Sequence, residues 1–182
     1  SAQSGIKPDS SITINGVTYP PLNIIARDLV NTITPTSPNH VCFWHGDLFF
    51  GNMMYDFTAA RVLCIDPRGQ LPSGQYCLYG DLRYDLAKLA HSIIGHYDKI
   101  LLNSSQLTKE NPLRWQFYVG AQPDHEQLES LYIRSVEERY GIDEVELLSI
   151  TALLFFSMLP LHKESPDRQK SFLAMGLRLS GR

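Results

Sequence analysis

The stretch HGDLFFGN, residues 45–52, joins a histidine, a carboxylate and an amide to two phenylalanines. It follows the short apolar stretch VCFW (41–44) and precedes NMMYD (52–56), so we expect a loop that connects strands. Two interpretations of this loop are open. It is either a tight turn over a core or a loop whose polar side chains do chemistry.

The composition limits the classes of protein to consider. The 182 residues suit one domain or one lobe of a larger one, and 43% hydrophobic against 19% charged residues predicts a packed core. A net charge of -3 argues against a general nucleic-acid binder. Three cysteines without C-x-x-C spacing make a disulfide framework or a zinc site unexpected and favour a reducing cytoplasm. The apolar run 147–161 is too short and too mixed for a membrane span, so we expect a buried helix.

The rest of the chain predicts a small β portion followed by about four helices. SITINGVTY (11–19) alternates around Asn15-Gly16, which is typical of a type I′ hairpin. Apolar residues at helical spacing, with capping patterns or prolines at the starts, predict helices over 21–33, 81–100, 124–141, 143–161 and from 165 onward. We expect 103–112 to be a loop and 113–120 to be a strand.

The spacing within HGDLFFGN points to phosphoryl transfer. A kinase catalytic loop has the pattern H-R-D-L-x-x-x-N, in which the Asp accepts the proton of a hydroxyl and the Asn binds magnesium. Asp47 and Asn52 have this spacing, with Gly46 in place of the arginine. A second acid, Asp66, ends the apolar strand VLCI, and we expect that strand to return beside the one entering the loop, with DFTAA (56–60) as the turn. Magnesium prefers such a set of few oxygen ligands, completed by phosphate and water.

Three motifs in this order give the chain a family resemblance. HGDLFFGN, VLCIDPRG and GDLRYDLAKLAHS together resemble the aminoglycoside phosphotransferase and choline kinase family, which is protein-kinase-like. The resemblance runs from about residue 41 to residue 92. It implies that Asp47 is the catalytic base and that Asn52 and Asp66 bind Mg²⁺. It also implies that His45 and Asp85 support the catalytic loop.

The chain departs from that family before the catalytic loop. The family has a nucleotide-holding lobe there, with a β-sheet, a phosphate-covering loop and a lysine. Only 44 residues precede His45, their single lysine is Lys7, and no G-x-G-x-x-G occurs. The stretch GQLPSGQY (69–76) has the glycine spacing of a P-loop but lacks the following Lys-Ser/Thr, so we reject that interpretation. We therefore interpret the chain as the C-terminal lobe of a longer protein and expect no appreciable ATP turnover from it alone.

Several residues keep a structural alternative. Asp47 could be a turn residue, and Asp66 could cap a strand before Pro67. Arg68 could contact phosphate or an acceptor, or simply pair with Asp66. Phe49 and Phe50 are expected to pack against the helices. Candidates for an acceptor pocket, each with a core or surface role as the alternative, are His91, His96, Trp115, Tyr118 and His162.

The sequence thus predicts a single α+β domain over residues 1–182, a mostly helical C-terminal lobe of a protein-kinase-like fold with a small β-hairpin portion. By resemblance, the full-length protein would be a cytoplasmic small-molecule kinase that transfers the γ-phosphate of ATP, with Mg²⁺, to a sugar or amino alcohol. We expect no nucleic-acid or membrane partner. One alternative is a non-catalytic binding module on the same scaffold. Another is a metal-dependent hydrolase, for which His40 and His45 supply too few ligands.

Overall fold

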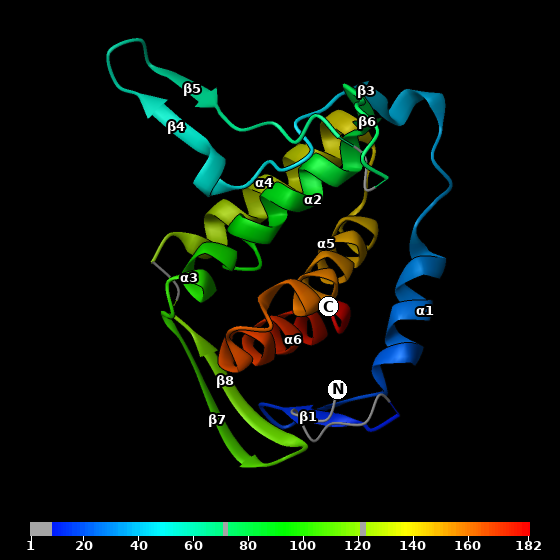
Figure 1. The fold of residues 1–182 in the computed structure, drawn as a ribbon, viewed down its shortest axis with the longest axis vertical. Coiled ribbons are helices and arrows are strands. Elements are labelled where there is room, and N and C mark those ends of the chain that lie inside the picture. Colours follow the sequence, from blue (N-terminus) through cyan, green and yellow to red (C-terminus); the bar gives the residue numbers. More distant parts are fainter. Residues whose placement is uncertain (1–8, 71–72, 121–122) are drawn as a thin grey trace.

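The computed structural model describes residues 9–70, 73–120 and 123–182, and its fold is α+β as predicted (Figure 1). Lys7 and part of the GQLPSGQY stretch lie outside the described residues. The α-helices are Leu22–Thr32 (α1), Leu82–Ile93 (α2), Tyr97–Leu101 (α3), His125–Tyr140 (α4), Glu144–Met158 (α5) and Pro166–Ser180 (α6). The strands are Ile12–Ile14 (β1), Val17–Tyr19 (β2), Val41–Phe43 (β3), Met53–Asp56 (β4), Arg61–Cys64 (β5), Tyr79–Asp81 (β6), Ser105–Asn111 (β7) and Arg114–Val119 (β8).

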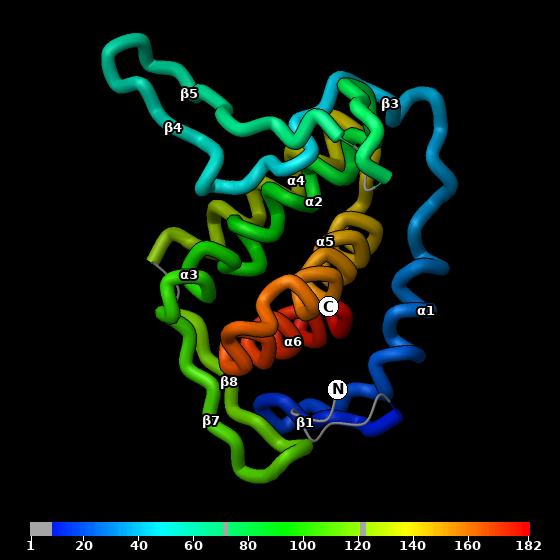
Figure 2. Tube along the Cα trace, in the orientation of Figure 1, coloured from blue at the N-terminus to red at the C-terminus, as the bar shows by residue number. Residues whose placement is uncertain are grey.

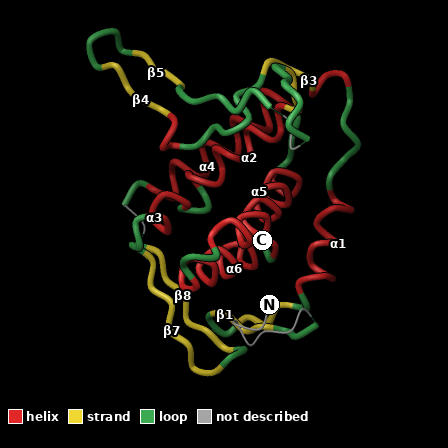
Figure 3. Tube along the Cα trace, in the orientation of Figure 1, coloured by secondary structure: helices red, strands yellow, loops and turns green. Residues whose placement is uncertain are grey.

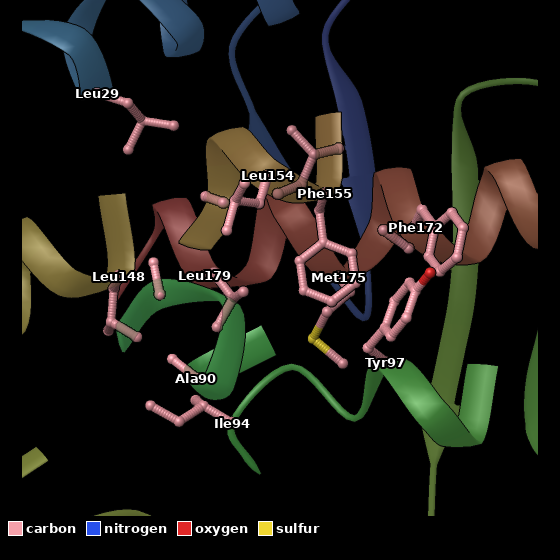
Figure 4. Packing of buried hydrophobic residues seen from close by; sticks show 14 of the residues in the cluster. Leu29, Ala90, Ile94, Tyr97, Leu148, Leu154, Phe155, Phe172, Met175 and Leu179 are labelled. Atoms are coloured by element: carbon pink, nitrogen blue, oxygen red, sulfur yellow. The ribbon is translucent and has the colours of Figure 1, made fainter. Parts of the chain in front are cut away.

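Helix α5 is the centre of the core. It packs against α6, α2 and α1, and the Asp143 carboxylate caps it by accepting a hydrogen bond from the Glu146 amide at 2.7 Å. Figure 4 shows Phe155 of α5 facing α6 and α3, where its ring lies 5.8 Å from that of Phe172 and 6.5 Å from that of Tyr97. The prediction of a buried apolar helix is therefore confirmed.

Helix α5 together with the 3-10 turn that follows it is long and apolar enough to cross a membrane by length and composition alone. The segment Glu144–His162 has a mean hydropathy of 1.7, but the core helix of a folded protein passes the same test. Eight residues of α5 are buried, among them Leu147, Leu148 and Phe155. This packing accounts for the apolar character of the helix.

A buried ion-pair network joins α2 to α5. The Arg83 side chain is 4% exposed and pairs with Asp81 and, at 2.7 Å, with Glu146. It also donates to the carbonyl oxygen of Thr34 at 2.9 Å, which ties in the segment after α1. Partial burial raises the pKa of Asp81, but hydrogen bonds from Arg83 and Thr36 outweigh burial and hold that pKa below its usual value.

The N-terminal hairpin belongs to a sheet of four strands in the order β2-β1-β8-β7. Asn15 and Gly16 both have positive φ, 51° and 84°, as a type I′ turn requires. The Asn15 side chain also donates to the carbonyl oxygen of Phe117 and accepts from its amide, at 2.8 and 2.7 Å. A turn residue near the start of the chain thus holds β8, 102 residues later.

The prediction that 103–112 is a loop was wrong. Residues Ser105–Asn111 form strand β7, which pairs antiparallel with β8 at the edge of the sheet (Figure 3). Because most of its side chains are exposed, the segment lacks the apolar alternation by which a strand is recognised in sequence. Its partner β8 alternates clearly between exposed and buried residues, and that strand was predicted.

The predicted helix over 81–100 is broken into α2 and α3. Gly95 lies at the break, and a Cβ there would lie 2.4 Å from the Phe155 ring. His96 follows in the left-handed conformation with φ 50°. The helix that the apolar spacing made continuous is therefore interrupted at Gly95 and His96, where the Phe155 ring of α5 packs directly on the backbone.

Two short antiparallel pairs flank the HGDLFFGN loop. Strand β3 enters the loop and pairs with β6, whereas β4 leaves it and pairs with β5. The turn over 56–60 is as predicted, but the strand before Asp66 returns beside the strand leaving the loop, not the one entering it. The short connection closes β4 and β5 into a hairpin, and β6 takes the edge of β3. The β4–β5 hairpin projects from the helical body (Figures 1 and 2).

Candidate active site around Asp47

The loop between β3 and β4 folds around the Asn52 side chain. Asn52 is only 9% exposed, and its amide donates to the carbonyl oxygen of Asp47 at 3.0 Å and lies 3.4 Å from Oδ2 of the same residue. Gly46 has φ 75°, a conformation that favours glycine, which accounts for glycine where the kinase pattern has arginine. The acid and the amide of the motif are therefore in direct contact.

The Asp85 carboxylate holds the start of the loop from α2. Its two oxygens accept from the backbone amides of His45 and Gly46, at 2.6 and 2.8 Å. The His45 ring donates from Nε2 to the carbonyl oxygen of Ile65 at 2.8 Å, and this contact sets its tautomer. These contacts fit supporting roles for His45 and Asp85 in the loop.

Asp66 and Asn52 are the residues that could hold a metal. The Ile65 amide donates to the carbonyl oxygen of Asn52 at 2.9 Å, so the chain next to Asp66 runs beside Asn52. Among the described residues, none donates to the Asn52 side-chain oxygen and none pairs with the exposed Asp66 carboxylate. Both oxygens are the hard donors that Mg²⁺ prefers, so the residues present fit this ion.

The described residues contain no group of three or more His, Cys, Asp or Glu that could hold a metal ion. A Mg²⁺ ion at Asn52 and Asp66 would need oxygens from phosphate and water, as is usual where this ion meets a nucleotide.

Arg68 lies against α2 rather than against Asp66. Its guanidinium donates to the Tyr84 hydroxyl at 3.1 Å, and its backbone amide donates to the carbonyl oxygen of His45 at 2.8 Å. No ion pair with Asp66 forms among the described residues. Arg68 is exposed, so its guanidinium remains accessible from solvent.

The comparison with protein families agrees with the motifs. Residues 17–114, more than half of the chain, match the model of the phosphotransferase enzyme family. The chain belongs to this family. No curated protein and no solved structure matches it. The matched region of this phosphotransferase extends beyond the three motifs, from β2 to the start of β8.

One residue at the site was not singled out from the sequence. The Lys88 ammonium pairs with Asp47 Oδ1 at 2.8 Å, and the Lys88 side chain is 5% exposed. It also lies over the rings of Phe49 and Tyr97, 5.3 and 5.7 Å from their centroids. Its position three residues after Asp85 on one helix was a signal in the sequence, because i and i+3 share a helix face.

The two phenylalanines of the loop have different environments. Phe49 packs against the core, with its ring 5.5 Å from that of Tyr97. Phe50 is 43% exposed, while its backbone amide donates to the buried Ser92 hydroxyl at 3.1 Å. The expected packing role thus describes Phe49, whereas Phe50 faces a cavity.

The cavity beside Phe50 has a volume of about 340 Å³. The stacked rings of His96 and His125 line it, with centroids 4.1 Å apart. Burial, then the charges of His125, Lys99 and Arg178, lower the pKa of His96 to about 4, and burial also lowers the pKa of His125. Both rings are therefore neutral near pH 7.

Of the five suggested acceptor-pocket residues, only His96 lines this cavity. His91 and Trp115 are fully buried in the core, and burial holds the pKa of His91 well below its usual value. Tyr118 is 64% exposed on β8. The His162 ring packs on Phe172, with centroids 5.0 Å apart.

Proposed function

We infer that this phosphotransferase chain carries the catalytic loop of an ATP-dependent small-molecule kinase. The observation that carries the proposal is the environment of the Asp47 carboxylate. It is partly exposed, Lys88 pairs with its Oδ1, the Asn52 amide lies 3.4 Å from its Oδ2, and it follows a loop start that Asp85 clamps. An oriented carboxylate open to one side is what a kinase needs to accept the proton of an attacking hydroxyl.

The proposed reaction has one transfer step. The acceptor oxygen forms a bond to the γ-phosphorus of ATP, the bond from that phosphorus to the bridging oxygen breaks, and ADP leaves. The proton of the acceptor hydroxyl goes to Asp47. Bound Mg²⁺ would supply neutralisation of phosphate charge, and Asn52 and Asp66 are the residues that would hold it.

The acceptor we propose is a sugar or an amino alcohol. The cavity beside Phe50 has a volume within the usual range for small-molecule sites. Neutral His96 and His125 can each donate one hydrogen bond and accept another, which suits a molecule rich in hydroxyl groups. We further propose a cytoplasmic protein with no nucleic-acid or membrane partner, in keeping with its net charge of -3 and its free cysteines.

The test uses the natural protein that carries this chain, with ATP, Mg²⁺ and a panel of sugars and amino alcohols. Asp47→Asn keeps the size of the side chain but removes the proton acceptor, so kcat should fall about 10²- to 10⁴-fold while nucleotide affinity changes little. Asp66→Ala should raise the Mg²⁺ concentration needed for half-maximal rate, and Asp47→Asn should leave it nearly unchanged.

Asp56→Asn is the matched control, because Asp56 is an aspartate of the β4–β5 hairpin outside the loop. Its kcat should equal that of the wild type. Near-wild-type turnover of Asp47→Asn on every acceptor would show that Asp47 is not the base. No transfer by the wild type to any acceptor, with ATP still bound, would instead favour a binding module.

A further inference from the structure

Helix α2 contacts the catalytic loop through a line of three polar side chains, Asp85, Lys88 and Ser92. Their spacing of i, i+3 and i+7 places them on one helix face. Asp85 accepts from the first two amides of the loop, Lys88 pairs with Asp47, and Ser92 accepts from the amide of Phe50. Within this face, Lys88 is the residue that contacts the side chain of the proposed base.

The burial of Lys88 is costly for the fold. Removing an ammonium from water costs several kcal/mol, and one ion pair often does no more than offset that cost. Asp47 is the carboxylate with which Lys88 pairs among the described residues. The Lys88 ammonium lies near two aromatic rings, those of Phe49 and Tyr97, which are surroundings that an apolar side chain also suits. Stability alone therefore gives little reason for a lysine at this position.

The contact between the two side chains has a defined geometry. The Lys88 ammonium lies 2.8 Å from Asp47 Oδ1, while Oδ2 makes only the long, 3.4 Å contact with the Asn52 amide. The Asp47 side chain is 31% exposed, so the carboxylate remains open on one side. Lys88 thus holds one oxygen closely, whereas the other has only the long contact with the Asn52 amide.

We propose that Lys88 is a positioning residue for the transfer reaction. It fixes the Asp47 carboxylate so that Oδ2 faces the acceptor hydroxyl. This inference rests on the proposed function, since it requires Asp47 to accept the proton. The aromatic rings around the ammonium hold it in place, because cations are attracted to ring faces.

The first experiment separates this role from a structural one. Lys88→Met keeps the length of the side chain, and the carboxylate that it leaves without a cation, Asp47, is 31% exposed and so still reaches water. The free energy of unfolding should therefore change little, unlike that of a variant that strands a buried carboxylate. In the natural protein, kcat should fall about 10- to 100-fold, because a misplaced catalytic group slows the reaction by such factors. KM for ATP and for the acceptor should change less than about threefold, because the Lys88 side chain is only 5% exposed and pairs with Asp47 from inside the protein.

A double variant tests whether Lys88 acts through Asp47. The variant Asp47→Asn with Lys88→Met should be no slower than Asp47→Asn alone, since positioning has no value once the base is gone. Lys170→Met is the control. Lys170 pairs with the exposed Asp167 on α6, away from the loop. The kcat of Lys170→Met should therefore equal that of the wild type.

The outcomes distinguish this proposal from the proposed function. If Asp47→Asn abolishes turnover and Lys88→Met keeps the wild-type kcat, the proposed role of Lys88 is wrong and the proposed function stands. A double variant slower than Asp47→Asn by the full Lys88 factor would also overturn it, as would a loss of kcat explained by unfolded protein. If the wild type transfers no phosphate, both proposals fail together.

Discussion

The helical body around α5 and the segment between residues 41 and 81, which carries the HGDLFFGN loop, are held together in different ways. In the body, large apolar side chains are buried against one another, with Phe155, Phe172 and Leu177 each below 2% exposed. More than half of the exposed large apolar side chains of the described residues lie between residues 41 and 79. Phe57, at 87% exposed, is the extreme case.

Polar contacts instead set the shape of the HGDLFFGN loop in the segment between residues 41 and 81. Asp85, Lys88 and Asn52 hold the loop through hydrogen bonds and one ion pair. Directional contacts set the orientation of a few groups, whereas apolar packing sets the stability of the whole. The comparison teaches that substitutions in the body should change mostly stability and those in the loop mostly catalysis.

The largest effect on stability is expected at the centre of the body. Phe155→Ala should lower the free energy of unfolding by about 3–5 kcal/mol, because it removes a fully buried ring and leaves a cavity. Phe57→Ala is the matched substitution in the other region and should change it by less than about 0.5 kcal/mol. Urea unfolding of both variants measures the difference, and equal losses would contradict the comparison.

A smaller or similar loss of unfolding free energy is expected when the buried ion-pair network of Arg83 is broken. Arg83→Met leaves Asp81 and the 9%-exposed Glu146 without their cation, which should cost about 3–5 kcal/mol at most. The control is Arg61→Met, which breaks an exposed pair with Asp56 at 3.7 Å and should cost about 0.2–1 kcal/mol. Thermal unfolding measures the Tm of both variants. If Arg61→Met lowered Tm as much as Arg83→Met does, the buried ion-pair network would not stabilise the fold.

Removing the hydrogen bonds between Asp85 and the start of the loop should lower the free energy of unfolding by a smaller amount. Asp85→Asn replaces one acceptor oxygen by an amide donor, so one backbone N–H of His45 or Gly46 loses its partner, at about 1–3 kcal/mol. Asp56 makes a similar pair of contacts with the amides of Thr58 and Ala59, but on the exposed hairpin. Asp56→Asn should cost less than about 0.5 kcal/mol, because asparagine suits such turns.

Chemical denaturation measures the free energy of unfolding of Asp85→Asn and Asp56→Asn. The rate of phosphate transfer by the natural protein then gives the kcat of each variant. Asp85→Asn should lower kcat beyond the loss of folded protein, since the loop start is no longer held. A variant with wild-type stability and wild-type kcat would show that the two hydrogen bonds do not shape the loop.

The smallest expected effect is on how the free energy of unfolding depends on pH, and it comes from a histidine of the helical body. An unfolded histidine takes up its proton near pH 6.5, whereas burial first, then nearby positive charges, lower the pKa of folded His96 to about 4. Between these values the unfolded state binds more protons, so stability present above pH 6.5 is lost as the pH falls toward 4. The lowered pKa of Asp81 removes stability only at lower pH, below its unfolded value near 3.9.

His96→Asn should therefore show a smaller loss of unfolding free energy between pH 7 and pH 5 than the wild type. Denaturant unfolding at the two pH values measures it. His91 and His125, whose pKa values are also lowered by burial, keep part of the dependence in the variant. An identical pH slope in both proteins would contradict the assignment to His96.

The contact within the HGDLFFGN motif and most helix boundaries could be predicted because they depend on local sequence. The Asn15-Gly16 turn, the Asp143 cap and the end of α4 at Gly141, with φ 68°, all follow from residues within a few positions of each other. The spacing within HGDLFFGN likewise placed Asp47 and Asn52 on one loop, and their contact is seen. The kinase-like arrangement of the lobe stays a prediction.

The sequence by itself thus determined the family, the polar set of the loop and the apolar helix at the core. Only the tertiary structure decided that β1 pairs with β8, that β5 lies beside β4 and that Phe155 packs on Gly95 between α2 and α3. It also decided that Lys88 is buried against Asp47, forty-one positions earlier in the chain. Caps, turns and helix faces depend on neighbours in sequence, whereas strand pairing and buried ion pairs depend on which distant segments the core brings together.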